Sequence, residues 1–194
     1  MDQDAPGAAN ASSASTLSFP IGHHVAQAAY SAEERATHIA RLAGQPAALA
    51  ASLSGLADDG FARSYRPGGW TVQQLVHHIV DSHVNMFVRV KLALSEDEPT
   101  IKPYDQDAWV LQPDVAAVAP MVSVALLSAL HERAVALYRA LTPEQFARGI
   151  MHPENGRMTV EQILAMYAWH GDHHIAQITA MRERERLESL VSSV

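Results

Sequence analysis

Three histidines fall within five positions of the segment YAWHGDHHIAQI, residues 167–178. Because a helix turns by about 100° per residue, His170 and His174 lie on one face, one turn apart, with Cβ atoms roughly 5–6 Å from each other. His173 lies about 100° away from His174 and leaves that face. The spacing therefore places two imidazoles side by side on one helix.

The face that carries His170 and His174 is otherwise apolar, which predicts that both rings are buried. Its other members are Val160, Ile163, Tyr167, Ile178 and Met181. A lone buried histidine usually finds a hydrogen-bond partner in the core, but two adjacent neutral rings need partners for four nitrogens. A divalent cation takes one lone pair from each ring and leaves the other N–H for an acceptor, so we interpret the pair as metal ligands.

A second predicted helix, over residues 71–94, supplies the other candidate ligands, His77, His78 and His83. His83 falls on the apolar line of this helix, whereas His77 and His78 flank that line on opposite sides. A polar row begins at His78 and continues at Ser82, Asn85 and Arg89. Such a row indicates either one wall of an internal polar pocket or a solvated face. Helical geometry does not choose between His78 and His83 as the third ligand.

Four segments with helical periodicity and very little strand signal predict an all-α four-helix bundle. The first helix begins after Ser31, runs towards residue 56 and should be kinked or interrupted at Pro46. The second begins at Thr71, the third spans about 120–141, and the fourth runs from Thr159 to about 187. Ser31, Thr71 and Thr159 are each followed three positions later by Glu or Gln, which predicts capping boxes.

Two connections stand out between these helices. A long loop that includes residues 101–110 joins the second and third helices, and connections of this length are usually functional or flexible. Its Tyr104 and Trp109 are candidates to cover the mouth of a pocket. The segment MHPENGR, before the fourth helix, contains the turn pair Asn155-Gly156 and predicts a short hairpin.

The composition of the 194 residues limits the classes of function. A net charge of −7 argues against a nucleic-acid partner, and the lack of cysteine excludes disulfides, thiolate metal sites and a cysteine nucleophile. We expect a disordered tail over residues 1–18, one bundle domain over 19–187 and a flexible C-terminus over 188–194. With no secretory signal and no apolar run of membrane-spanning length, the sequence favours a cytoplasmic protein without membrane contact.

Several motifs in this order resemble the YfiT-like branch of the DinB superfamily. They are YRPGGWTVQQLVHHIVDSHVNMFVRVKLAL, PTIKPYDQDAW and YAWHGDHHIAQI, and the similarity covers residues 19 to about 185. The resemblance implies a four-helix bundle that binds a divalent metal through three histidines. One is the second histidine of the HH pair, here His78, and the others form an H-x3-H motif, here His170 and His174. It also implies a homodimer.

Three imidazoles leave an ion such as zinc with an open coordination position, where a water can have its pKa lowered to around 7 or a small thiol can bind as thiolate. Nickel accepts the same ligands. Zincin proteases place a glutamate directly after the first histidine, and here that residue is Gly171. Asp81 and Asp172 should both point away from the metal. We therefore expect no zincin-type peptidase and find no dedicated general base.

The resemblance implies a metal-dependent hydrolase of a small-molecule substrate. The alternative is an S-transferase that uses a low-molecular-weight thiol of the bacillithiol, mycothiol or glutathione type. A second alternative is a non-catalytic stress-response or binding protein, stabilised by a metal whose fourth ligand is His83 or His152. Asn85 and Arg89, on the polar row of His78, are candidates to hold an anionic group of the substrate.

Overall fold

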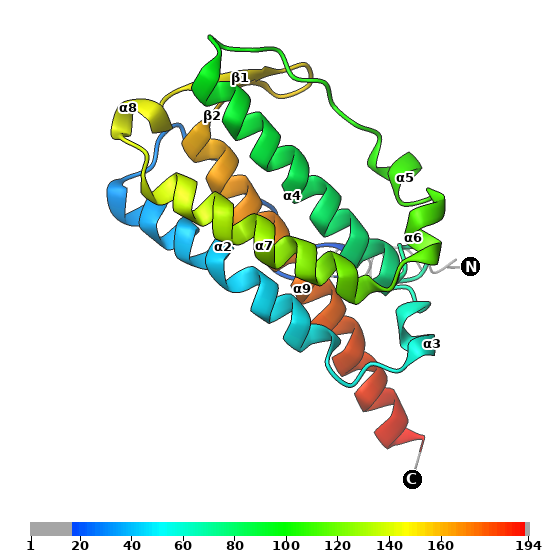
Figure 1. Cartoon of the computed structure of the whole chain (residues 1–194). Coiled ribbons are helices and arrows are strands. Elements are labelled where there is room, and N and C mark those ends of the chain that lie inside the picture. The colour runs from blue at the N-terminus through cyan, green and yellow to red at the C-terminus, as the bar shows by residue number, and fades with distance from the viewer. Residues whose placement is uncertain (1–16, 193–194) are drawn as a thin grey trace, which may run out of the picture.

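The computed structural model describes residues 17–192, and its architecture confirms the predicted all-α four-helix bundle (Figure 1). The long helices are α2 (Ala32–Leu53), α4 (Val72–Ser95), α7 (Pro120–Arg139) and α9 (Val160–Val191). The predicted tail lies outside the described residues except for positions 17 and 18, as do residues 193–194 of the predicted flexible C-terminus. The last helix continues to Val191, four residues beyond its predicted end.

The predicted capping boxes fix where three of these helices begin. Ser31, Thr71 and Thr159 each accept a hydrogen bond from the backbone N–H three residues on, and the Glu or Gln at that position bonds back to the cap. The third long helix, α7, begins instead with Pro120 at its first position, where a missing N–H costs nothing. Local chemistry thus defines the N-terminus of each long helix.

The order of the helices around the bundle brings the two histidine-bearing helices together. Both α2 and α4 pack against α7 and α9, so α2 lies diagonally opposite α4, and α7 lies diagonally opposite α9. In Figure 1, α2 and α9 run in one direction and α4 and α7 run in the other. As a result, α4 and α9 are antiparallel neighbours.

Short elements fill the connections between the long helices. The helix α3 (Asp58–Phe61) follows α2, and the long loop after α4 contains α5 (Gln106–Trp109) and α6 (Pro113–Ala117). After α7 come α8 (Pro143–Phe146) and an antiparallel hairpin of β1 (Gly149–His152) and β2 (Gly156–Thr159). Gly156 has φ +70°, a conformation that favours glycine, so the predicted turn is confirmed.

The sequence predicted a kink or an interruption at Pro46, and the interruption is wrong, because α2 is continuous through that residue. Proline lacks the N–H that would bond to the carbonyl four residues earlier, which is that of Leu42. In the folded chain Nδ1 of His131, on α7, lies 2.8 Å from the Leu42 carbonyl oxygen and donates to it. A side chain of the neighbouring helix thus replaces the missing backbone donor.

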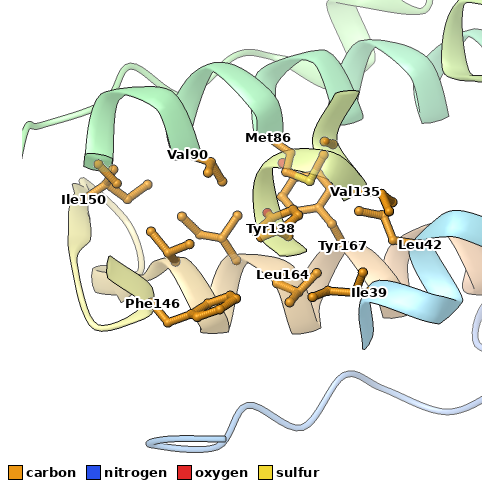
Figure 2. Close-up of a cluster of buried hydrophobic side chains, with 14 of the residues drawn as sticks. Ile39, Leu42, Met86, Val90, Val135, Tyr138, Phe146, Ile150, Leu164 and Tyr167 are labelled. Carbon is orange, nitrogen blue, oxygen red and sulfur yellow. The ribbon is translucent and has the colours of Figure 1, made fainter. Parts of the chain in front are cut away.

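The core consists of two apolar clusters, one towards each end of the bundle. Figure 2 shows the cluster beside the hairpin, where Tyr138, Met86 and Leu164 pack between the helices. The second cluster lies around Leu75 on α4 and Ile178 on α9. Along α9, the three histidines 170, 173 and 174 fall between the parts of the helix that enter the two clusters.

Among the described residues, α7 is the one helix long and apolar enough to cross a membrane by length and composition. A single helix of this kind is weak evidence for a span, since core helices of bundles share these features. Here α7 packs against α2 and α4 and buries Leu127, Ala134 and Tyr138 between them.

Gly171 lets α2 approach α9 closely. A Cβ atom at this position would overlap the side-chain amide of Gln45, which is buried and donates to the Ala168 carbonyl (2.8 Å) and to Asp172 Oδ1 (3.1 Å). Asp172 also pairs with Arg41, so its carboxylate joins the two helices, as expected of a residue that points away from His174.

We expect Gly171→Ala to lower the free energy of unfolding by about 1–3 kcal/mol, because the new methyl group must displace the buried Gln45 amide. Urea denaturation of the two proteins measures the change. Gly44→Ala is the matched control, since a Cβ at Gly44 meets no atom within 4 Å and alanine favours the helix. Equal stability of the Gly171→Ala variant and the parent would contradict the close approach.

Candidate metal centre

His78 on α4 and His170 and His174 on α9 converge to form one group. Their candidate ligand atoms all lie within 4.8 Å of one another, and Nε2 of His78 lies 3.3 Å from Nε2 of His170. Two nitrogens bound to one tetrahedral zinc at 2.0–2.1 Å are about 3.3–3.4 Å apart. The separation of His78 and His170 therefore matches that of two ligands of one small divalent ion, and His174 lies close enough to belong to the same group.

A glutamine one turn beyond His174 determines which of its nitrogens faces the group. The side-chain amide nitrogen of Gln177 donates to the Ser18 carbonyl (2.7 Å) and to Nε2 of His173 (3.1 Å). Its Oε1 must then accept, and Nδ1–H of His174 donates to it at 2.8 Å. This tautomer leaves the Nε2 lone pair of His174 free to bind a metal.

Burial keeps the three imidazoles neutral. Desolvation lowers the pKa of His78 to about 4. It also lowers the pKa of His170 and of His174 well below the usual value, and the neighbouring histidines lower both further. A neutral ring has a lone pair available, so all three are in the protonation state that binds metal at neutral pH.

The three histidines line a pocket of about 450 Å³. Aromatic rings of Phe19, Trp70 and Trp169 form part of its wall, and the Trp70 ring lies 4.7 Å from that of His78. Its other polar side chains include one cation, Arg66, and one carboxylate, Asp107, among the described residues. A pocket with imidazoles, apolar walls and few charges suits a small, mostly neutral molecule.

The loop that includes residues 101–110 reaches this pocket, but not through the two candidate residues, Tyr104 and Trp109. The rings of Tyr104 and Trp109 pack against each other at a tilt, with centroids 4.5 Å apart, and neither lines the pocket. Gln106 and Asp107, between them on α5, do line it. Asp107 is exposed, so a carboxylate is available at the pocket that helical periodicity did not reveal.

The polar row predicted on α4 is partly internal. Ser82 and Arg89 are buried, and Arg89 donates to the Tyr167 hydroxyl at 3.2 Å. Asn85 is partly exposed and donates to the Asp81 carbonyl at 2.9 Å. Neither Asn85 nor Arg89 lines the pocket, and their assignment to a substrate stays a prediction.

The two residues considered as a fourth protein ligand lie elsewhere. His83 faces the back of His170, with Nε2 3.4 Å from its Nδ1. His152 lies on β1, where its Nδ1 accepts from the Glu154 N–H. Within residues 17–192, no further histidine, aspartate or glutamate joins the group. Three candidate protein ligands beside a pocket match the pattern of a metal site that keeps one coordination position open.

Gln177 was not predicted as part of the site, although the sequence carried a signal for it. Gln177 lies three positions after His174 and seven after His170, a spacing that places it on the same side of the helix. The contribution of Ser18 and Phe19 had no such signal, because both lie outside the four segments in which helical periodicity is present. Phe19 lies 5.4 Å from the His173 ring, which also stacks on Trp169.

Comparison with known proteins gives one consistent result. A sequence model of the DinB superfamily matches residues 41–178. The chain is 43% identical over 169 residues to a protein of Bacillus subtilis named "Putative metal-dependent hydrolase YfiT", covering 87% of this chain and 95% of the relative. A relative from Bacillus mycoides with the same description is 40% identical, covering 87% and 96%.

The fold has a similar counterpart among solved structures. The structure of YfiT from Bacillus subtilis, described as a probable metal-dependent hydrolase with an unusual four-helix bundle topology, matches with a TM-score of 0.85 at 43% identity. The match covers 88% of this chain and 98% of that one.

Proposed function

Because the chain belongs to the DinB superfamily, we propose that it is a metal-dependent hydrolase that acts on a small molecule. His78, His170 and His174 hold one divalent metal in this proposal, and zinc and nickel both suit imidazole ligands. The observation that supports it most directly is the convergence of three imidazoles from two helices at a pocket.

A bound divalent ion supplies a Lewis acid that lowers the pKa of a water molecule in its open position to around 7. The side chains of the pocket perform the remaining tasks. Gln177 holds His174 in the required tautomer, and the rings of Trp70 and Trp169 offer apolar contact to a substrate while limiting the access of bulk water. Arg66 is the pocket's candidate to orient an anionic group.

Asp107 is the candidate to accept a proton from the attacking nucleophile. It is the one carboxylate among the described residues that line the pocket, and α5 places it there. General base catalysis of this kind contributes about 10²–10⁴-fold to a rate.

We expect Asp107→Asn to reduce kcat by about 10²-fold, the low end for a general base because the carboxylate is exposed, while metal content stays unchanged. Steady-state kinetics and elemental analysis on the same samples measure the two quantities. Asp97→Asn removes the same charge from an exposed carboxylate outside this pocket and should keep full activity. Full activity in the Asp107 variant would remove this residue from the mechanism.

One observation favours the alternative, a transferase for a low-molecular-weight thiol. Among the described residues, no buried carboxylate lies beside the histidines, and a thiol with a pKa near 8.5 needs less help to ionise than water does. Arg66 would then pair with a carboxylate of the thiol cosubstrate. A non-catalytic metal site is less well supported, because no fourth protein ligand among the described residues closes it.

The deciding experiment compares the protein loaded with zinc or nickel with the same protein after chelation. Each sample is assayed with monochlorobimane plus bacillithiol, mycothiol or glutathione, and with panels of esters and amides. Metal-dependent turnover of an ester or amide supports the hydrolase. Metal-dependent conjugation without hydrolysis supports the transferase, and a tightly bound metal with neither activity supports the binding protein.

A further inference from the structure

A row of three imidazoles begins at His170 and continues away from the pocket. Nδ1 of His170 lies 3.4 Å from Nε2 of His83, and Nδ1 of His83 lies 2.8 Å from Nε2 of His131. The row ends where Nδ1 of His131 meets the Leu42 carbonyl oxygen at 2.8 Å. The three rings come from α9, α4 and α7 and the carbonyl comes from α2, so the hydrogen bonds connect all four long helices.

The carbonyl at the end of the row is available because of Pro46. In a regular helix the N–H of residue 46 would bond to the Leu42 carbonyl, and proline has no N–H. Since α2 continues through this residue, the carbonyl stays directed along the helix without a backbone donor. The donor it receives is the ring N–H of His131, a residue that is 1% exposed.

A carbonyl oxygen can only accept, and this determines the direction of every hydrogen bond in the row. His131 must carry its proton on Nδ1, so its Nε2 accepts from Nδ1–H of His83. By the same step, Nε2 of His83 accepts from Nδ1–H of His170. The Nε2 atom of His170 then has no proton and presents its lone pair to His78.

We propose that His83 and His131 are positioning residues that fix His170 in its Nδ1–H tautomer and so direct its Nε2 lone pair into the metal group. This inference rests on the proposed metal site but not on either reaction. Acceptors for the second ring N–H of a metal-bound histidine are usually single carboxylates, carbonyls or waters. Here two further imidazoles, His83 and His131, link His170 to a carbonyl on a different helix. Because that carbonyl can only accept a hydrogen bond, it sets the tautomer of each ring in the row.

The first test needs neither metal nor turnover. Protein labelled with ¹⁵N in its histidine rings is stripped of metal at pH 7.5, and long-range ¹H–¹⁵N spectra report which nitrogen of each ring is protonated. We expect Nδ1–H for His170, His83 and His131. Protonation of His170 or His83 on Nε2 would overturn the proposal.

The second test measures zinc affinity by competition with a chelating dye. His131→Phe keeps a ring but removes both nitrogens, so His83 loses its acceptor and can reverse its tautomer; we expect zinc to bind about 10–100-fold more weakly. His131→Gln offers an oxygen to His83 and an N–H to Leu42 and should bind within about threefold of the parent.

His77→Phe is the matched control for loss of a buried histidine. His77 makes two hydrogen bonds, to Ser123 Oγ and the Val118 carbonyl, and lies outside the row. The His77→Phe variant should bind zinc with an affinity within about threefold of that of the parent. Parental affinity in His131→Phe, or equal weakening by Phe and Gln, would overturn the proposal. A parent protein that binds no zinc would instead refute the proposed function, and the ring spectra would still decide the tautomers.

Discussion

Replacing His174 by alanine is expected to reduce bound transition metal from about one ion per chain to nearly none. The substitution removes one of the three proposed ligands, the donor that Gln177 holds in the metal-binding tautomer. A second-sphere change alone typically costs 10–100-fold in metal affinity, so loss of a direct ligand should cost more. Elemental analysis of the purified, dialysed protein measures the stoichiometry.

The stability of the same variant provides a second readout. An ion at 100 times its dissociation constant stabilises the folded state by about 2.7 kcal/mol, so zinc should raise the Tm of the parent and chelation should lower it. The His174→Ala variant should show neither response. A variant that keeps its full complement of metal would refute the three-histidine site.

His173→Ala is the control for this experiment, because it removes the histidine that directly precedes His174 in the chain. His173 accepts from the amide of Gln177, but that amide also donates to Ser18 and keeps its orientation without His173. We therefore expect metal content near the parental value. Equal loss in both variants would indicate general disruption of α9 rather than removal of a ligand.

The metal-free protein is expected to lose several kcal/mol of stability as the pH falls from about 6.5 to 4. Burial lowers the pKa of His78 and of His131 to about 4, whereas an unfolded histidine titrates near 6.5. Above pH 6.5 both states are neutral and these residues contribute nothing to the pH dependence. Below it the unfolded state takes up protons that the folded state excludes, so acid favours unfolding.

The size of the effect follows from the two pKa values. A difference of about 2.5 units corresponds to about 3 kcal/mol for each of these two histidines once the pH reaches 4. Burial also lowers the pKa values of His83, His170 and His174 well below the usual value, so these residues add to the slope. Urea denaturation of the protein after metal removal, at intervals between pH 7.5 and 4.5, measures this pH dependence of the free energy of unfolding.

Among the described residues, the carboxyl group of Asp81 has the opposite effect on stability at low pH. Burial raises the pKa of Asp81 to about 6, with a further contribution from Asp114, so this carboxyl favours the folded state in acid. It is partly exposed and therefore screened by solvent, and it cannot offset several buried imidazoles. His131→Gln removes one titrating ring and should give a shallower slope. A constant free energy of unfolding between pH 6.5 and 5 would contradict neutral burial of the histidines.

The sequence by itself determined the long helices and part of the site. Thr71 and Thr159 mark two helix starts through contacts within one turn, which do not depend on the rest of the fold. The spacing of His170 and His174 places them on one face of one helix for the same reason. These features are local, so composition and periodicity are enough to predict them.

The tertiary structure decided what lies opposite that face. His78 and His83 are five residues apart, or about 140° around α4, and both come close to His170. His78 lies near Nε2 of His170 and His83 lies near its Nδ1. His78 therefore belongs to the candidate ligands, and His83 lies behind them. Periodicity gives the direction of a side chain about its own helix axis, but not the rotation and register of the neighbouring helix.

The packing of neighbouring helices also explains why the prediction of an interruption at Pro46 was wrong. Within α2 alone, Pro46 removes a hydrogen bond and predicts an interruption. The donor that replaces it, His131, lies 85 positions away and reaches Leu42 only because α7 packs against α2. The Ser18 carbonyl and the α5 carboxylate also reach the site from distant parts of the chain. Such contacts depend on how the helices pack, which the pattern of a single helix does not encode.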